Sequence, residues 1–132
     1  MKTDEQIITE LERAAAGLML MSESDYPFEV VRWEQLTEVT VDDLRHLTGQ
    51  PQALVVFENI EDFFRPSITE RAGQSETERQ IVEKYRGLLR TLSENLEDLR
   101  VYKVGERNIP VFIVGRAPSG CWLGLSSRVI ET

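Results

Sequence analysis

The longest periodic segment of the chain, residues 76–96, most strongly limits how the chain can fold. Its apolar residues recur at helical spacing, with charged residues on the opposite side. The residues that carry this period are Ile81, Tyr85, Leu88, Leu92 and Leu96. This pattern predicts one long amphipathic helix, and such a helix must bury its apolar face against another layer of the fold.

The residues after this helix supply a candidate for that layer. Three segments have the β-branched and aromatic content of strands: 100–104, 109–114 and 121–130. Short polar turns at 105–108 and 117–120 separate them. Because turns this short join antiparallel neighbours, we expect an antiparallel meander.

Two further helices are predicted in the first half of the chain. One spans residues 4–20, with Thr3 as its N-cap and Gln6 three residues later. The other spans residues 41–48, with Thr40 as its N-cap, and a glycine and a proline end it. Both have an apolar stripe that should face the sheet.

A strand is predicted over residues 28–36. Strand alternation places Val31 and Trp33 on one face, and Phe28 and Val30 on the other.

The remaining segments are one apolar run and two expected loops. The apolar run 53–57 is typical of a strand covered on both faces, so helices should lie on both sides of the sheet. We expect loops at 22–27 and at 58–75, the second with one helical turn near Phe63. The pattern predicts one domain over residues 1–132, an α+β or α/β sandwich around a single sheet.

Charge and composition exclude several classes of function. The chain has 15 basic and 23 acidic residues, a formal charge of −8, which opposes binding to nucleic acids and anionic lipids and favours basic proteins. His46 is the only histidine, so neither a site with several imidazole ligands nor a triad independent of His46 is possible. Cys121 is the only cysteine, and the N-terminus has acids where a signal peptide is basic, so a cytoplasmic location is expected.

An acidic segment lies in the first expected loop. Glu23, Asp25 and Glu29 could together hold a divalent ion through their carboxylates. Alternatively, Ser22, Ser24 and Asp25 satisfy backbone groups of the loop while Glu23 faces solvent.

The last residues form a second unusual feature. Strand character continues through residues 128–130, where most chain ends would fray. A strand at this point would hold the Glu131 carboxylate and the Thr132 hydroxyl and α-carboxylate at fixed positions.

These features occur together in a known family. The sequence resembles the nuclease A inhibitor-like family, whose best-known member blocks a sugar-non-specific nuclease. The matching segments run over essentially the whole chain: 21–30, 33–34, 62–64, 101–102, 105–106, 117–120 and 129–132.

The resemblance implies an α/β/α sandwich with a mixed or antiparallel central sheet and helices packed on both faces. It also implies that an acidic loop residue and the terminal threonine lie near the catalytic metal of the nuclease. Glu23 and Thr132 occupy these positions here. One member of this family carries a tryptophan that contacts its enzyme in the loop before the long helix, whereas this chain has Gly73.

We therefore expect a monomeric protein inhibitor, rather than an enzyme, without a cofactor and without a metal of its own. Its partner would be a magnesium-dependent, sugar-non-specific endonuclease. The expected interface residues are Ser22, Glu23, Ser24, Asp25, Glu29, Glu131 and Thr132. One alternative is an acidic interaction module for a different basic protein, and a second is a small metal hydrolase built on the carboxylates of the loop.

Overall fold

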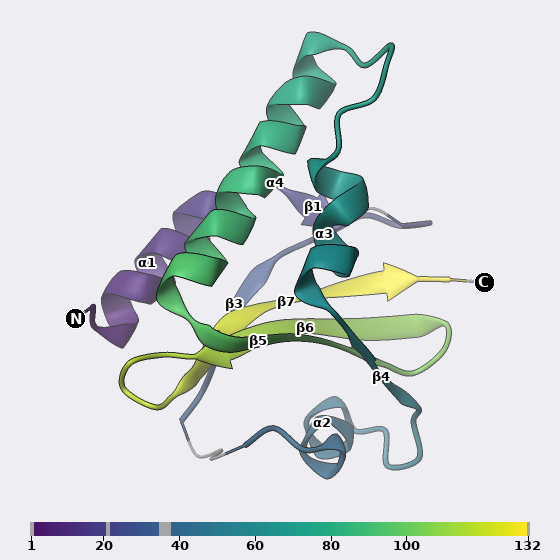
Figure 1. Ribbon diagram of the computed structural model, residues 1–132. Coiled ribbons are helices and arrows are strands. Elements are labelled where there is room, and N and C mark those ends of the chain that lie inside the picture. Colours follow the sequence, from purple (N-terminus) through teal and green to yellow (C-terminus); the bar gives the residue numbers. More distant parts are fainter. Residues whose placement is uncertain (1, 21, 35–37, 132) are drawn as a thin grey trace.

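The computed structural model describes residues 2–20, 22–34 and 38–131. Its helices are α1 (Asp4–Ala15), α2 (Val41–Thr48), α3 (Ile60–Ile68) and α4 (Glu76–Asn95) (Figure 1). Its strands are β1 (Met19–Leu20), β2 (Tyr26–Pro27), β3 (Glu29–Trp33), β4 (Val55–Glu58), β5 (Glu97–Val104), β6 (Asn108–Arg116) and β7 (Trp122–Ile130).

The larger sheet has five strands in the order β3-β7-β6-β5-β4. Every neighbouring pair in it is antiparallel. The two short strands β1 and β2 pair separately with each other. The antiparallel meander expected after the long helix is confirmed as β5, β6 and β7, with slightly different ends.

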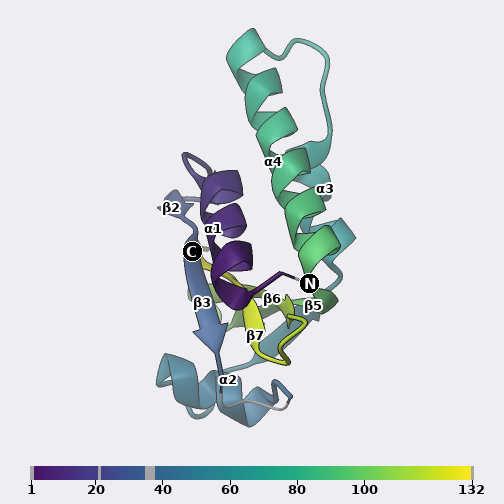
Figure 2. The ribbon, with the colours of Figure 1, turned by 90° about the vertical axis from the view of Figure 1, so that its left-hand side faces the viewer.

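Helices cover both faces of this sheet. Figures 1 and 2 show α1, α3 and α4 on one side and α2 on the other. On the first side, Leu88 of α4 packs in one core with Ile113 and Leu125 of the sheet. On the second side, Leu44 of α2 packs in another core that contains Trp122. The predicted α/β/α sandwich with helices on both faces is therefore confirmed.

Local sequence signals correctly located three helix starts. Thr3, Thr40 and Ser75 cap α1, α2 and α4, and each forms a reciprocal capping box with a residue three positions later. The two faces predicted for the strand at residues 28–36 are also confirmed. Val31 and Trp33 pack on the α2 side, and Phe28 and Val30 pack on the other side.

The prediction for the end of the first helix was wrong. Helix α1 ends at Ala15 rather than at residue 20. Gly17 adopts a φ of +78°, a left-handed conformation that ends a helix and favours glycine. The chain after it forms β1, which pairs with β2 inside the segment expected to be a loop. The strand predicted over 28–36 is shorter, Glu29–Trp33, and positions 35 and 36 lie outside the described residues.

Two predictions for the middle of the chain were also wrong. Strand β4 was expected to be covered on both faces. It instead lies at the edge of the sheet, and its residues Val56 and Phe57 are exposed. The segment expected to be a loop with one helical turn near Phe63 contains the nine-residue helix α3 (Ile60–Ile68), so the helix there is longer than predicted. Asn59 begins this helix by accepting hydrogen bonds from the backbone N–H groups of Glu61 and Asp62. No helix in the described part of the chain is long and apolar enough to cross a membrane.

Candidate functional site

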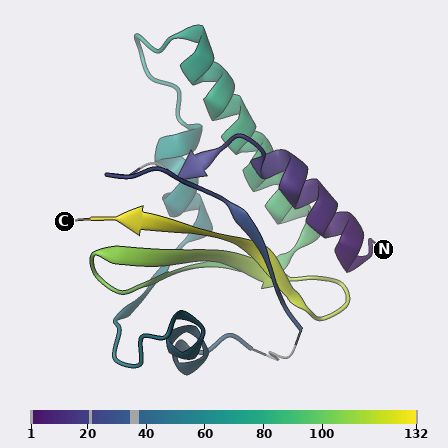
Figure 3. The same cartoon turned by 180° about the vertical axis from the view of Figure 1, so that it is seen from behind.

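The acidic segment singled out from the sequence lies in the loop between β1 and β2. Glu23, Ser24 and Asp25 are exposed, and Ser22 is half-buried. Figures 1 and 3 both show this loop beside the end of β7. The two features that the sequence marked as unusual therefore lie next to each other.

Ser22 joins the loop to the last residue of β7. Its hydroxyl oxygen accepts a hydrogen bond from the Ile130 N–H at 3.0 Å. The same hydroxyl donates to the Ser24 carbonyl at 2.8 Å and closes the loop on itself. The Glu23 N–H donates to the Ile130 carbonyl at 3.4 Å, so two consecutive loop residues bond to one strand residue. These bonds fix the backbone that carries the Glu23 carboxylate.

Two further bonds hold the surroundings of this loop. The Ser127 hydroxyl donates to the Tyr26 and Pro27 carbonyls, at 3.2 and 3.0 Å, and so joins β2 to β7. The Glu131 N–H donates to the Arg107 carbonyl at 2.8 Å, which fastens the residue after β7 to the turn between β5 and β6. The position expected for Thr132 lies outside the described residues.

The exposed carboxylates of the loop and of the residue after β7 are both held next to Ile130. Glu23 bonds through its backbone to Ile130, and Glu131 follows Ile130 directly. Asp25 lies in the same loop and is exposed. We call Ser22, Glu23, Ser24, Asp25 and Glu131 the acidic edge. Such a group of exposed carboxylate oxygens attracts a basic surface and can reach a cation held by another protein.

Glu29 is placed differently from the acidic edge. It is the first residue of β3, opposite Ser126 of β7, and it is exposed. Strand alternation turns its side chain to the face opposite Val30, which is the side of α2.

A metal site made from Glu23, Asp25 and Glu29 is not supported. Across residues 2–20, 22–34 and 38–131, no three His, Cys, Asp or Glu side chains are grouped so that they could hold an ion. The cluster that the hydrolase alternative requires is not present among these residues.

Tyr85 of α4 holds β1, the strand that leads into the loop of the acidic edge. Its hydroxyl donates a hydrogen bond to the Met19 carbonyl of β1, and its ring lies edge-on to Phe28, with the two centroids 6.3 Å apart. Burial, with a smaller contribution from the negative charge of Asp25, raises the pKa of Tyr85 to about 12.

The stability of the fold is expected to fall as pH rises from about 10 to about 12. An unfolded tyrosine ionises near pH 10, whereas Tyr85 keeps its proton until its folded pKa of about 12. The stabilisation is complete below pH 10, and it is lost at about 1.4 kcal/mol per pH unit as the unfolded state ionises first. Urea unfolding at a series of pH values should show a steeper loss for the wild type than for Tyr85→Phe. If both proteins lose unfolding free energy equally with pH, ionisation of Tyr85 does not cause the loss.

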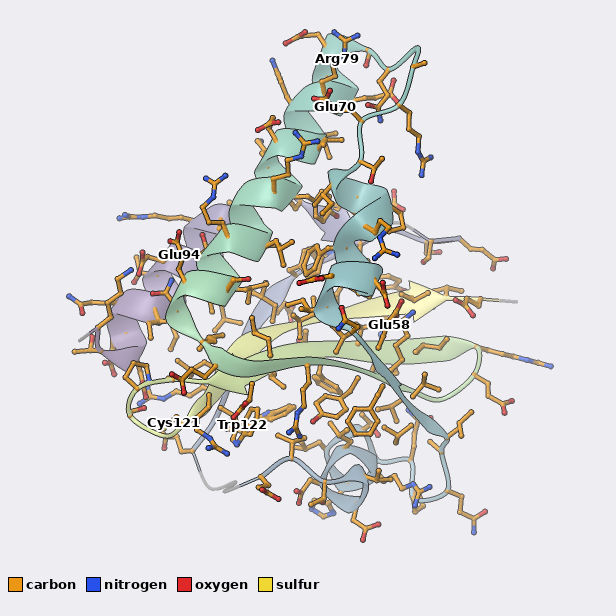
Figure 4. The ribbon with its side chains drawn as sticks, viewed as in Figure 1. Glu58, Glu70, Arg79, Glu94, Cys121 and Trp122 are labelled. Carbon is orange, nitrogen blue, oxygen red and sulfur yellow. The ribbon has the colours of Figure 1, made fainter. Side chains whose placement is uncertain are left out.

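Sequence reasoning missed the residues that hold the acidic edge in place. Ser127 and Arg107 gave no signal, because each acts through hydrogen bonds to residues distant in the sequence. Tyr85 was assigned to the core from its helical spacing, and its 4% exposure confirms that assignment but not the role of its hydroxyl. Cys121 is half-buried against the core and lies at the other end of the sheet (Figure 4).

Gly73 occupies a tight turn before α4. Its φ is +84°, and the turn is closed by hydrogen bonds between Arg71 and Gln74, one of them from the Arg71 N–H to the Gln74 side chain at 2.9 Å. A tryptophan at this φ would be strained. The turn geometry is therefore suited to the glycine that this chain has.

Comparison with known proteins adds one finding. A family model described as nuclease A inhibitor-like protein matches residues 5–132, nearly the whole chain. A search of curated proteins found no match to the chain.

Proposed function

The chain belongs to the nuclease A inhibitor-like family, a family of nuclease inhibitors, and from that premise we propose that it blocks a magnesium-dependent, sugar-non-specific endonuclease by covering its active site. The observation that carries this proposal is the pair of hydrogen bonds between the loop and Ile130. These bonds present the loop carboxylates and Glu131 as one preformed unit. A preformed surface loses little conformational entropy on binding.

In the proposed complex, Glu23 and Thr132 lie near the metal ion of the nuclease. Carboxylate and hydroxyl oxygens are ligands that magnesium accepts at positions otherwise taken by water or phosphate. The metal belongs to the partner, and the inhibitor needs no metal or cofactor of its own.

The other expected interface residues act in two ways. Asp25, Glu29 and Glu131 add negative charge that takes the place of substrate phosphates in a basic groove. Ser22 and Ser24 hold the loop, since the Ser22 hydroxyl bonds to both the Ser24 carbonyl and Ile130.

Family membership indicates that this protein inhibits a nuclease rather than being an enzyme itself. The formal charge of −8 is consistent with this role, because it favours a basic protein and opposes direct binding to nucleic acid. We place the inhibitor in the cytoplasm, where it would protect the cell from its own nuclease.

Affinity for the nuclease should depend on the metal ion and on the tail. We expect chelation of the magnesium, and separately the removal of Glu131 and Thr132, each to weaken binding at least about tenfold. Calorimetric titration of the inhibitor, tagged only at its N-terminus, into the nuclease with magnesium and with a chelator measures both effects. Equal affinity under all conditions would contradict the placement of the acidic edge at the metal.

A second candidate function is an interaction module for a different basic protein. The turn at Gly73 favours it, because this chain lacks the aromatic anchor that one family member has there, and interface energy concentrates in such anchors. In this case the acidic edge would only steer association. Binding would then be strongly dependent on salt and independent of metal.

A further inference from the structure

The two edges of the five-stranded sheet differ in how they are protected. Strand β3 forms one edge and β4 the other. Figure 3 shows β3 nearest the viewer from behind, whereas β4 lies on the near side in Figure 1. An unprotected edge strand can pair with another strand, and proteins usually block it with charges, prolines or bulges.

Strand β3 has such protection. Pro27 precedes it, and it contains the exposed charged residues Glu29 and Arg32. The Arg32 guanidinium forms ion pairs with Asp4 at 3.3 Å and with Glu34 at 2.9 Å. An added strand on this side would meet fixed charges.

Strand β4 lacks this protection. Two of its own residues are exposed, Val56 by 43% and Phe57 by 57%, and so is Leu54, the residue before the strand, by 59%. The only charged residue of the strand is Glu58, and its carboxylate is paired with the Lys103 ammonium at 2.8 Å. The edge is therefore apolar and carries no uncompensated charge of its own.

The backbone of β4 also offers hydrogen-bonding groups to a partner strand. The Gly105 N–H donates to the Leu54 carbonyl at 2.9 Å, which makes this a hydrogen-bonded pair of the antiparallel ladder. Such pairs alternate along a ladder, and Val55 opposes Val104 while Phe57 opposes Tyr102. The N–H and C=O groups of Val55 and Phe57 therefore point away from β5, toward the open edge.

We propose that this edge pairs with the same edge of a second copy of the chain, so that two β4 strands join antiparallel about a two-fold axis at Val56. Val55 of each copy then exchanges backbone hydrogen bonds with Phe57 of the other. The two Val56 side chains meet across the axis on one face, and Phe57 packs against Val55 on the other. The surface is self-complementary, which is what a two-fold interface requires.

This pairing replaces the expectation of a monomer and is independent of the proposed inhibition. The acidic edge is attached to β7 and to the turn between β5 and β6, and β4 lies at the far side of the sheet from β3 and β7. A dimer would present two acidic edges. Because β4 has only four residues, the interface is small and dimerisation is expected to be weak.

Sedimentation velocity from about 10 µM to about 1 mM measures this association. Wild type should shift from monomer toward dimer as concentration rises. Val56→Lys should remain monomeric, because two ammonium groups would face each other across the axis. Ile81→Lys is the matched control, since it makes the same charge change at a residue on α4 that is 45% exposed, and it should dimerise like the wild type.

Hydrogen exchange of the wild type gives a second measurement that needs no variant. The Val55 and Phe57 amides should become more protected as concentration rises. A monomer at every concentration, equal dimerisation of Val56→Lys and Ile81→Lys, or a dimer without added protection of these two amides would each overturn the proposal. Nuclease inhibition by Val56→Lys should equal that of the wild type, so the outcome is separate from that of the proposed function.

Discussion

Replacing Glu23 with alanine is expected to weaken nuclease inhibition by about 2 to 5 kcal/mol, roughly thirtyfold to several-thousandfold in the inhibition constant. In the proposed complex this carboxylate faces the metal ion of the nuclease and is buried. Its removal leaves the positive charge of the partner without an oxygen ligand. The loop itself should survive the change, because the bonds to Ile130 use the backbone of Glu23 and the hydroxyl of Ser22.

A charge-matched control separates a local effect from loss of overall negative charge. Glu94 is an exposed carboxylate on α4, away from the acidic edge (Figure 4). Glu94→Ala should inhibit like the wild type. The inhibition constants of both variants would be measured beside their far-ultraviolet circular dichroism. If Glu23→Ala and Glu94→Ala inhibit equally well, Glu23 has no special role.

Replacing Trp122 with alanine should lower the free energy of unfolding by about 3 to 5 kcal/mol. Trp122 is 1% exposed and fills the core between the sheet and α2, where Leu44 and Tyr102 also pack. The guanidinium carbons of Arg100 and Arg116 lie 5.9 and 5.3 Å from its ring centroid, so the variant also loses two cation–π contacts.

Urea unfolding measures this effect, with Trp33→Ala as the comparison. Trp33 is only half-buried on β3, where its ring lies 5.4 Å from that of Phe112, so its removal should cost less. A Trp122→Ala protein as stable as the wild type would show that the α2 side of the sheet is not a true core.

Local rules predicted the elements that local contacts determine. The capping boxes at Thr3 and Thr40 use side chains three residues from each helix start, so they can be recognised in the sequence alone. The alternation in β3 could be recognised for the same reason. The end of α1 was also encoded locally, in Gly17, but the apolar period continued through Leu18 and concealed it.

The errors in the middle of the chain have a tertiary cause. The apolar run at β4 has the composition of a central strand, yet the sheet ends there. Nothing within those residues shows whether a neighbour lies beyond them. In α3, Phe64 is fully buried and supports a helix that also contains Pro66, so packing stabilises a segment in which the local pattern was unclear.

The candidate site was predicted in its parts but not in its assembly. The sequence indicated Glu23 and Asp25 in one segment and Glu131 in another. Their common attachment to the end of β7 depends on the Ser22 hydroxyl, which reaches a residue 108 positions away. Spacing cannot show such a contact, because it exists only once the strands have paired.

Titration of the wild-type protein against a magnesium-dependent, sugar-non-specific nuclease, with plasmid cleavage as the readout, tests the central claim most directly. We predict that cleavage falls in proportion to added inhibitor and stops at one inhibitor per nuclease. Full cleavage at a large molar excess of folded inhibitor would contradict the claim for that nuclease.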